Sequence, residues 1–295
     1  MLLKLNLNGS AEPFISYLKN YLRIRESLLL EIDTKTRAFV AKTYTEDKSS
    51  VRFSSIMFDD ANVKIVSDDG EETRGESRIK VGILIQLKKF IQIIERLGSD
   101  VDKEGNANFD IEIEYDQLVN QKDNSIDFIA TSIAFKSDIL TMRMDGFRPS
   151  EFTYLQDDKF LGVVFNVKDP ITLEMSADVI NSIIKTSDIV KIDVRKDALV
   201  FYVEGKTLYV KDRGNGTEKK PNFVYKLGEL EAEPEYAVSI PITRDRFMKM
   251  LDKTDENFKI IIGKSVNGDG ESVDRVLFDS LKTSTKIVIA AMKDY

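Results

Sequence analysis

A short apolar strand pattern that leads directly into an amphipathic helix recurs four times along this 295-residue chain. The clearest copy is residues 79–98, IKVGILIQLKKFIQIIERLG, which predicts a strand over 79–83 and a helix from residue 84 to Gly98. Apolar residues at three- and four-residue spacing form one stripe: Leu84, Leu87, Phe90, Ile91, Ile94 and Leu97. Internal repetition of this kind restricts the possible folds more than any single motif does.

The other three copies predict helices over 10–23, 176–187 and 243–253, each opened by a residue that can cap a helix. The four helix starts, near residues 11, 84, 177 and 244, are 73, 93 and 67 residues apart. The longer middle interval contains residues 144–162, which are rich in acidic residues and turn formers and show no period. We therefore expect a first domain over 1–143, a connector over 144–162 and a second domain over 163–295.

Between the helices, apolar and polar residues alternate as they do in half-buried strands. Strands are predicted over 2–7, 28–33, 37–44, 51–56, 63–66, 109–115, 126–131, 133–142, 171–175, 189–194, 198–203, 207–211, 223–226, 236–240, 258–262, 275–279 and 285–291. The pattern indicates an α+β fold of two similar domains, with helices on one face of antiparallel sheets.

Composition excludes the commonest catalytic centres, because the chain has no Cys and no His. Disulfides, thiolate nucleophiles, histidine bases and histidine metal ligands are all ruled out. Gly263-Lys264-Ser265 resembles the end of a phosphate-binding loop, but the glycine that such a loop needs at position 258 is a phenylalanine. We assign no catalytic residue, no metal ligand and no cofactor.

Two acidic segments have the composition of cation sites without the required spacing. Residues 267–271 (NGDGE) predict a hairpin turn rather than a calcium loop. Asp68, Asp69, Glu71 and Glu72 lie in a polar stretch that predicts a solvated turn. No apolar run approaches the length of a membrane span, and the first seven residues are too short and polar for a signal peptide.

Positive charge is concentrated in the predicted helices. They contain ten Lys or Arg and five Asp or Glu, a net +5, which leaves −12 on the rest of a chain whose total is −7. One basic helix alone is typical of a solvated face, but agreement among helices points to contact with phosphates, which Lys and Arg make without reading sequence. Aromatic residues are missing from these faces, which favours a duplex over a single strand.

With these features the chain resembles the DNA sliding clamps, the family of proliferating cell nuclear antigen and the T4-type phage processivity clamps. The resemblance lies in the four strand–helix units, the segment RIKVGILIQLKKFIQIIERLG at 78–98, the connector, and the ending KIVIAAMKDY at 286–295. It implies a clamp fold that closes as a homotrimeric ring, with helices around the central hole. It also implies a set of DNA-facing residues: Lys19, Arg23, Lys88, Lys89, Arg96, Lys185, Arg246, Lys249 and Lys253.

The resemblance implies two further surfaces. Subunits would meet at sheet edges, 133–142 of one copy and 207–211 of the next, with these contact residues: Ile133, Phe135, Ile139, Thr207, Tyr209 and Lys211. Partner peptides would dock in an apolar pocket whose residues could equally belong to the core: Phe39, Val40, Phe147, Phe152, Tyr154, Leu155, Ala290, Ala291 and Met292. The weakly basic third helix and the long loops at 100–108 and 212–220 depart from the family pattern.

The function that the resemblance implies is that of a non-enzymatic processivity factor. Such a ring would encircle double-stranded DNA, bind a polymerase and a clamp loader, and work in the cytoplasm, that of the host if the protein is encoded by a phage. The alternative is a viral structural or assembly protein built of repeated β-rich domains.

Overall fold

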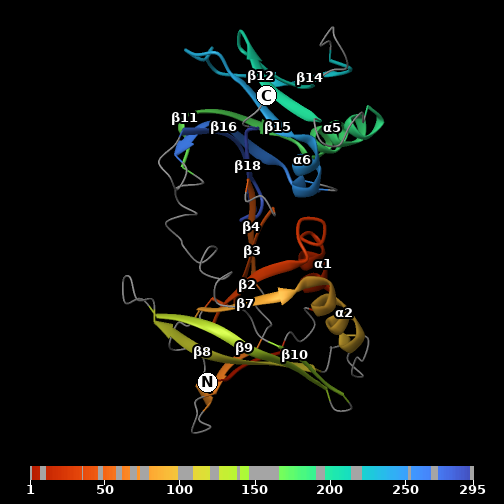
Figure 1. Cartoon of the computed structure of the whole chain (residues 1–295), viewed down its shortest axis with the longest axis vertical. Helices are drawn as coiled ribbons and strands as arrows, with labels where there is room; N and C mark the ends of the chain where they lie inside the picture. Colours follow the sequence, from red (N-terminus) through yellow and green to blue (C-terminus); the bar gives the residue numbers. More distant parts are fainter. Residues whose placement is uncertain are drawn as a thin grey trace. The chain divides into compact units, whose positions relative to one another are not determined.

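The computed structural model describes residues 2–6, 11–34, 36–45, 49–57, 62–66, 72–73, 80–98, 109–119, 126–137, 140–145, 166–190, 197–213, 221–251, 254–266 and 272–292. The chain divides into two compact units (Figure 1). The first comprises Met1–Thr43 and Ser54–Asp157, and the second comprises Tyr44–Phe53 and Asp158–Tyr295. Apart from Met144 and Asp145, the predicted connector falls outside the described residues.

The first unit pairs its strands in two runs, β6–β5–β1–β8–β9–β10 and β4–β3–β2–β7. A short parallel pair, Val81 with Phe128 and Gly82 with Ile129, joins β7 to β9. The bounds are β1 (Leu2–Asn6), α1 (Ala11–Lys19), β2 (Ser27–Asp33), β3 (Ala38–Tyr44), β4 (Ser50–Met57), β5 (Asn62–Val66), β6 (Glu72–Thr73), β7 (Lys80–Gln86), α2 (Leu87–Gly98), β8 (Phe109–Val119), β9 (Ile126–Ser137) and β10 (Thr141–Asp145).

The second unit repeats this order, with runs β11–β16–β17–β18 and β14–β13–β12–β15. Its last strand also pairs with residues 50–53 of β4, which belong to this unit. The bounds are β11 (Lys168–Met175), α5 (Ala177–Ile189), β12 (Ala198–Glu204), β13 (Thr207–Asp212), β14 (Val224–Glu229), β15 (Ser239–Thr243), α6 (Arg244–Leu251), β16 (Phe258–Val266), β17 (Ser272–Ser280) and β18 (Lys286–Ala290). The predicted α+β fold with four strand–helix units is therefore confirmed.

Aromatic rings seat α1, α2 and α6 on their sheets, as the apolar stripes predict; the Phe90 ring of α2 lies 5.3 Å from Phe135 of β9. In the first unit α1 and α2 lie side by side (Figure 1), and the Phe14 ring lies 5.0 Å from Phe39 and 6.3 Å from Phe90. In the second unit the Phe247 ring of α6 lies 5.8 Å from Phe278 and 6.2 Å from Phe201. None of the described helices is long and apolar enough to cross a membrane.

The boundary between the strand and the helix in the clearest repeat lies three residues later than predicted. β7 continues to Gln86 because it pairs with β2 over its whole length, with Leu84 opposite Leu29. The helix therefore starts at Leu87, and Leu84 belongs to the strand. Ile93 is buried although it lies outside the predicted stripe.

Other boundaries also differ from the sequence prediction. The predicted strand 126–131 and the first part of the predicted strand 133–142 form one strand, β9, whereas Thr141 and Met142 begin β10. Ile189, predicted to open a strand, ends α5, and residues 191–196 lie outside the described residues. The predicted strand 236–240 begins at Ser239 instead. The predicted cap of the third helix is confirmed, because the Ser176 hydroxyl accepts a hydrogen bond from the Val179 amide.

A β-bulge in β11 explains the glycine of the Gly263-Lys264-Ser265 segment. The register between β11 and β16 shifts between Lys168 and Ile171, and Asp169 takes a left-handed backbone with φ of 46°. A Cβ on Gly263 would lie 2.5 Å from Val167 Cγ1 and 2.9 Å from the Lys168 carbonyl oxygen. Gly263 is therefore needed for a close approach of two strands and not for phosphate binding.

Two tyrosines attach α1 and the turn after it to the β3–β4 hairpin. The Tyr17 hydroxyl donates to the Ser54 carbonyl at 2.8 Å and accepts from the Ala41 amide at 3.0 Å. The Tyr21 hydroxyl contacts Ser54 Oγ and donates to the Ala41 carbonyl at 3.3 Å. Burial first, and then the neighbouring Tyr21, raise the pKa of Tyr17 well above its usual value.

This raised pKa predicts a loss of stability in alkali. The unfolded chain releases the Tyr17 proton near pH 10, whereas the folded protein retains it, so the free energy of unfolding falls as the pH rises above about 10. One such group contributes a slope of up to about 1.4 kcal/mol per pH unit. Urea unfolding of the protein and of Tyr17→Phe between pH 9 and 11 measures it. The variant should show the shallower decline, and equal slopes would contradict the assignment.

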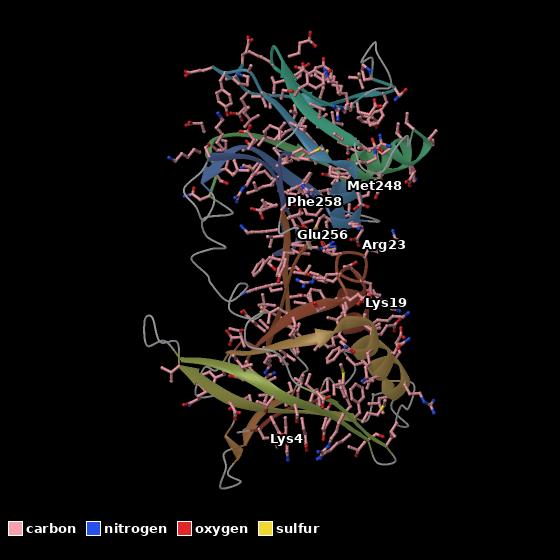
Figure 2. All side chains as sticks on the ribbon, in the orientation of Figure 1. Lys4, Lys19, Arg23, Met248, Glu256 and Phe258 are labelled. Atoms are coloured by element: carbon pink, nitrogen blue, oxygen red, sulfur yellow. The ribbon has the colours of Figure 1, made fainter. Side chains whose placement is uncertain are left out.

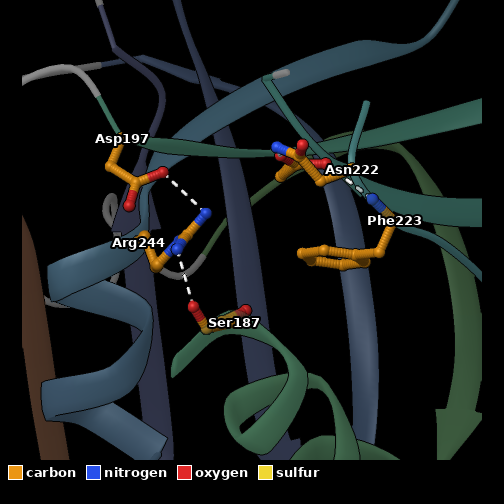
Figure 3. Close-up of polar contacts among 6 residues, drawn as sticks. Ser187, Asp197, Asn222, Phe223 and Arg244 are labelled. Atoms are coloured by element: carbon orange, nitrogen blue, oxygen red, sulfur yellow. Dashed lines mark hydrogen bonds and ion pairs between the residues drawn. The ribbon is translucent and has the colours of Figure 1, made fainter. Parts of the chain in front are cut away.

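A buried ion pair joins the start of α6 to the second unit's core (Figure 3). Arg244 Nη2 lies 2.7 Å from Asp197 Oδ1, and Arg244 Nη1 donates to the Ser187 carbonyl at 2.7 Å. The Arg244 amide also donates to the Asp197 carbonyl. Both side chains are at most 9% exposed. Arg244 therefore fixes the end of α5 and the start of α6 together.

Removing the Asp197 carboxylate should destabilise the folded protein, because it leaves the buried Arg244 guanidinium without its counter-charge. We expect Asp197→Ala to lower the free energy of unfolding by about 3 kcal/mol or more, measured by urea unfolding with circular dichroism. Asp245→Ala is the matched control, because it breaks the exposed Asp245–Lys249 pair, worth less than about 1 kcal/mol. Equal losses in the two variants would show that the buried pair is no stronger than a surface pair.

Candidate functional site

The polar side of α2 is the clearest basic surface among the described residues. Lys88, Lys89 and Arg96 are exposed, and they lie opposite the buried face that begins with Leu87 and Phe90. Among the described side chains, neither Lys88 nor Lys89 has a carboxylate within ion-pair distance. Their charge is therefore available to an anionic partner.

α1 extends this basic surface in the first unit. Lys19 is exposed, and its Nζ lies 2.7 Å from Glu95 Oε1 of α2. Arg23 is exposed in the turn after the helix, and Figure 2 shows both residues on the side of the unit that α1 occupies. The Lys19–Glu95 pair links the two helices while leaving both side chains about half exposed.

The helices of the second unit carry less available positive charge. Lys185 is exposed on α5, but the exposed acids Asp178 and Asp188 lie on the same helix. On α6, Lys249 is paired with Asp245 at 2.9 Å and Arg246 is half-buried, while Lys253 lies outside the described residues. Arg244 is buried, so the charge summed over the helix sequences exceeds the charge that reaches the surface.

The exposed cations of these helix faces have the chemistry that phosphate binding needs. Lys and Arg side chains on an exposed helix contact a backbone of phosphates without reading base sequence. Within the described ranges, no group of three or more acidic side chains is placed to hold a metal ion. Of the four carboxylates in the predicted turn, Asp68, Asp69 and Glu71 lie outside the described residues, and only the backbone of Glu72 is described.

The predicted peptide pocket is only partly described. Phe39 is fully buried against Phe14, so it belongs to the core of the first unit, while Val40 is half-buried. Ala290, Ala291 and Met292 are half-buried, and their amides donate to carbonyls of the second unit. Four predicted residues lie outside the described residues: Phe147, Phe152, Tyr154 and Leu155.

The strands predicted to join subunits have neighbours on both sides. Ile133 and Phe135 are buried in β9, between β8 and β10, and Ile139 lies outside the described residues. β13 lies between β12 and β14, where Tyr209 stacks on Tyr202 at 5.3 Å. Lys211 Nζ lies 4.5 Å from the centre of the Tyr202 ring. Thr207, Tyr209 and Lys211 are therefore not at an open edge.

Among the described strands, the edges one strand further out, β10 and β14, are open. In the part of the chain that the structure describes, β10 pairs only with β9, and β14 pairs only with β13. Val224, at the start of β14, is 50% exposed. The equivalent strands are already paired: β18, the counterpart of β10, pairs with β4, the counterpart of β14. The sequence shows strands but not their neighbours, so this pairing could be recognised only from the repeated topology.

The fold is that of the DNA sliding clamps. The chain is similar to PCNA in the PCNA2–PCNA3 complex from Sulfolobus tokodaii, with 13% identity, a TM-score of 0.53 and 99% coverage of both chains. It is similar to A. fulgidus PCNA bound to the C-terminal region of FEN-1, with 11% identity, a TM-score of 0.55, and 99% and 97% coverage of this chain and that one. It is also similar to the Helicobacter pylori beta clamp bound to a DNA ligase peptide, with 17% identity, a TM-score of 0.57, and coverage of 100% and 67%. No protein-family model and no curated protein matches the sequence.

The share of each matched chain that is covered differs between the two types of clamp. The chain spans nearly all of the PCNA chains but about two thirds of the bacterial beta clamp. Identities of 11–17% establish the shared fold, and the predicted clamp fold is thereby confirmed.

Proposed function

We propose that this protein is a sliding clamp, a non-enzymatic processivity factor that encircles duplex DNA and tethers a polymerase during replication. The observation that carries the proposal is the conjunction of the clamp fold with an exposed basic face on α2, which holds Lys88, Lys89 and Arg96. Contacts from such a face with DNA phosphates do not depend on base sequence, which allows the protein to slide, and they weaken as the salt concentration rises. The alternative of a β-rich structural protein is not favoured, because the solved structures that the chain resembles are sliding clamps.

The proposed ring is a homotrimer, joined by pairing β10 of one copy with β14 of the next. The β18–β4 pair supports this arrangement, because it joins the same two types of strand in antiparallel register, with Val288 opposite Val51. Pairing β10 with β14 would also remove two open edges that otherwise invite aggregation. Three copies of two repeated units would give the six-domain ring that the family resemblance implies.

The proposed partners are a polymerase and a clamp loader, which would bind through short peptides. Support comes from two of the similar structures, which hold a DNA ligase peptide and the C-terminal region of FEN-1. The peptide-contacting residues would come from the connector, with Phe147, Phe152, Tyr154 and Leu155, and from the end of the chain, Ala290 to Met292. Such a clamp would act in the cytoplasm, that of the host if the protein is phage-encoded.

Charge reversal on α2 should weaken DNA binding specifically. We expect Lys88→Glu/Lys89→Glu to reduce affinity for a labelled duplex at least about tenfold, and to lower the slope of log K against log salt by about 2. Fluorescence anisotropy across a salt series measures both quantities. Stability should change by less than about 0.5 kcal/mol, because both side chains are exposed.

The matched control is Lys206→Glu/Lys282→Glu. Both lysines are exposed in turns of the second unit and belong to no helix, and the net charge changes by the same amount. This control should bind DNA within about threefold of the unchanged protein. Equal losses in the two double variants would mean that overall charge, and not the α2 face, governs binding.

Assembly can be tested at the open edge of β14. A buried unpaired carboxylate at a subunit contact should weaken assembly at least about tenfold, so Val224→Asp should shift a trimer toward monomer. Light scattering coupled to size exclusion at micromolar concentration gives the mass. Val119→Asp is the control, because Val119 is similarly exposed, at 56% against 50%, and lies on neither β10 nor β14. An unchanged protein that is monomeric at these concentrations would contradict the ring.

A further inference from the structure

The two repeated units differ at the outer edge of their first strand. In the first unit β5 pairs with β1 along five residues, from Leu2 opposite Val66 to Asn6 opposite Asn62. The corresponding segment of the second unit, residues 230–238, is fully described and forms no strand. β11, the counterpart of β1, pairs only with β16 among the described residues (Figure 1). One edge of β11 is therefore open where its counterpart is covered.

A cavity of about 870 Å³ lies along this open edge. One wall is formed by six consecutive residues of β11, from Asp169 to Glu174, and the other by residues 229–236. Successive residues of a strand point to opposite faces, so a cavity lined by six in a row follows the edge and not one face. We call this cavity the β11 groove.

The β11 groove is held open by contacts at both ends. The Tyr236 hydroxyl donates to the Asp169 carbonyl at 3.0 Å. Further along, Leu173 packs against Gly228 of β14, where a Cβ would lie only 3.0 Å from Leu173 Cδ1. The bulge and Pro170 protect the start of β11 from pairing, because proline has no amide to donate. Residues 171–175 have no such protection.

The walls of the β11 groove are strongly acidic. Six carboxylates line it, with one lysine, Lys259: Asp169, Glu174, Glu229, Glu231, Glu233 and Glu235. Glu231, Glu233 and Glu235 alternate along an exposed segment. Among the described lysines, Lys226 engages Glu229 of that wall at 3.0 Å, and none engages the other three. Burial raises the pKa of the Tyr236 hydroxyl, and the nearby Asp169 and Asp274 raise it further. The β11 groove therefore combines the open strand edge of residues 171–175 with a negatively charged lining.

We propose that the β11 groove binds an extended, lysine- or arginine-rich segment of a partner protein, which adds as a strand to the open edge of β11. Main-chain hydrogen bonds to residues 171–175 would hold the segment, as β5 is held by β1 in the first unit. Its basic side chains would lie against Glu231, Glu233 and Glu235. Recognition would therefore require both an extended backbone and positive charge, and it does not depend on DNA binding.

The charge requirement is tested with an acetylated and amidated Lys-Val-Lys-Val-Lys-Val-Lys peptide, titrated calorimetrically into the full chain at 150 mM salt. Glu231→Lys/Glu233→Lys should weaken binding at least about tenfold. Glu204→Lys/Asp255→Lys changes the net charge equally at exposed positions outside the groove, and it should weaken binding less than about threefold. Equal losses, or no binding at millimolar peptide, would overturn the proposal.

The backbone requirement is tested separately, so that simple charge attraction is distinguished from strand addition. Hydrogen exchange followed by NMR should show the amides of residues 171–175 that point away from β16 exchanging at least about tenfold more slowly with the peptide bound. Two further versions of the peptide, one N-methylated at every Lys and the other at every Val, keep the charge, but each lacks the amide donors of one edge. Strand addition uses a single edge, so one of the two versions should bind at least about tenfold more weakly than the parent peptide. Unchanged exchange in β11, or equal binding of both methylation patterns and the parent peptide, would refute strand addition.

Discussion

Pairing at strand edges is the constraint on which the rest of this structure depends, because unpaired amides and carbonyls must find partners or face solvent. Within the second unit β18 pairs with residues 50–53 of β4, a segment contributed from early in the chain. In the first unit β5 covers the edge of β1. β10, β14 and β11 each have a single partner among the described residues, and these are the edges to which we assign partners outside the chain. The strand edges without a second neighbour therefore indicate where other molecules could bind.

The spacing of apolar residues was enough to predict the repeated strand–helix unit, because apolar residues three and four apart are typical of a helix that packs on a core. The contacts of Phe90 and Phe247 with the strands beneath them follow from that spacing. Periodicity could not place the end of β7, since Leu84 fits both a helix stripe and an alternating strand. Its pairing with Leu29, more than fifty residues away, decides the matter. The same applies to β9, whose length is set by β8 and not by its own alternation.

The candidate site was predictable for side chains that lie on the side of a helix opposite its buried apolar residues, as Lys88 and Lys89 do on α2. It was not predictable where a remote residue changes the environment. Arg244 counts as a helix cation in the sequence, yet Asp197 and the Ser187 carbonyl hold it in the core. Phe39 reads as an apolar pocket residue, yet Phe14 encloses it. The charge and hydrophobicity of a residue make it a candidate for a binding site, but its tertiary contacts decide whether it is exposed to a ligand.

The two unlike edges, β10 and β14, give any assembly built from them a direction. A contact between different surfaces is heterologous, so every copy added must have the same orientation as the one before it. A closed ring of this kind has two distinguishable faces, and a protein bound at the same place on each copy approaches from one side only. On a duplex, such a ring would present all its partners toward the same end of the DNA. The polarity of the assembly would thus follow from the difference between β10 and β14.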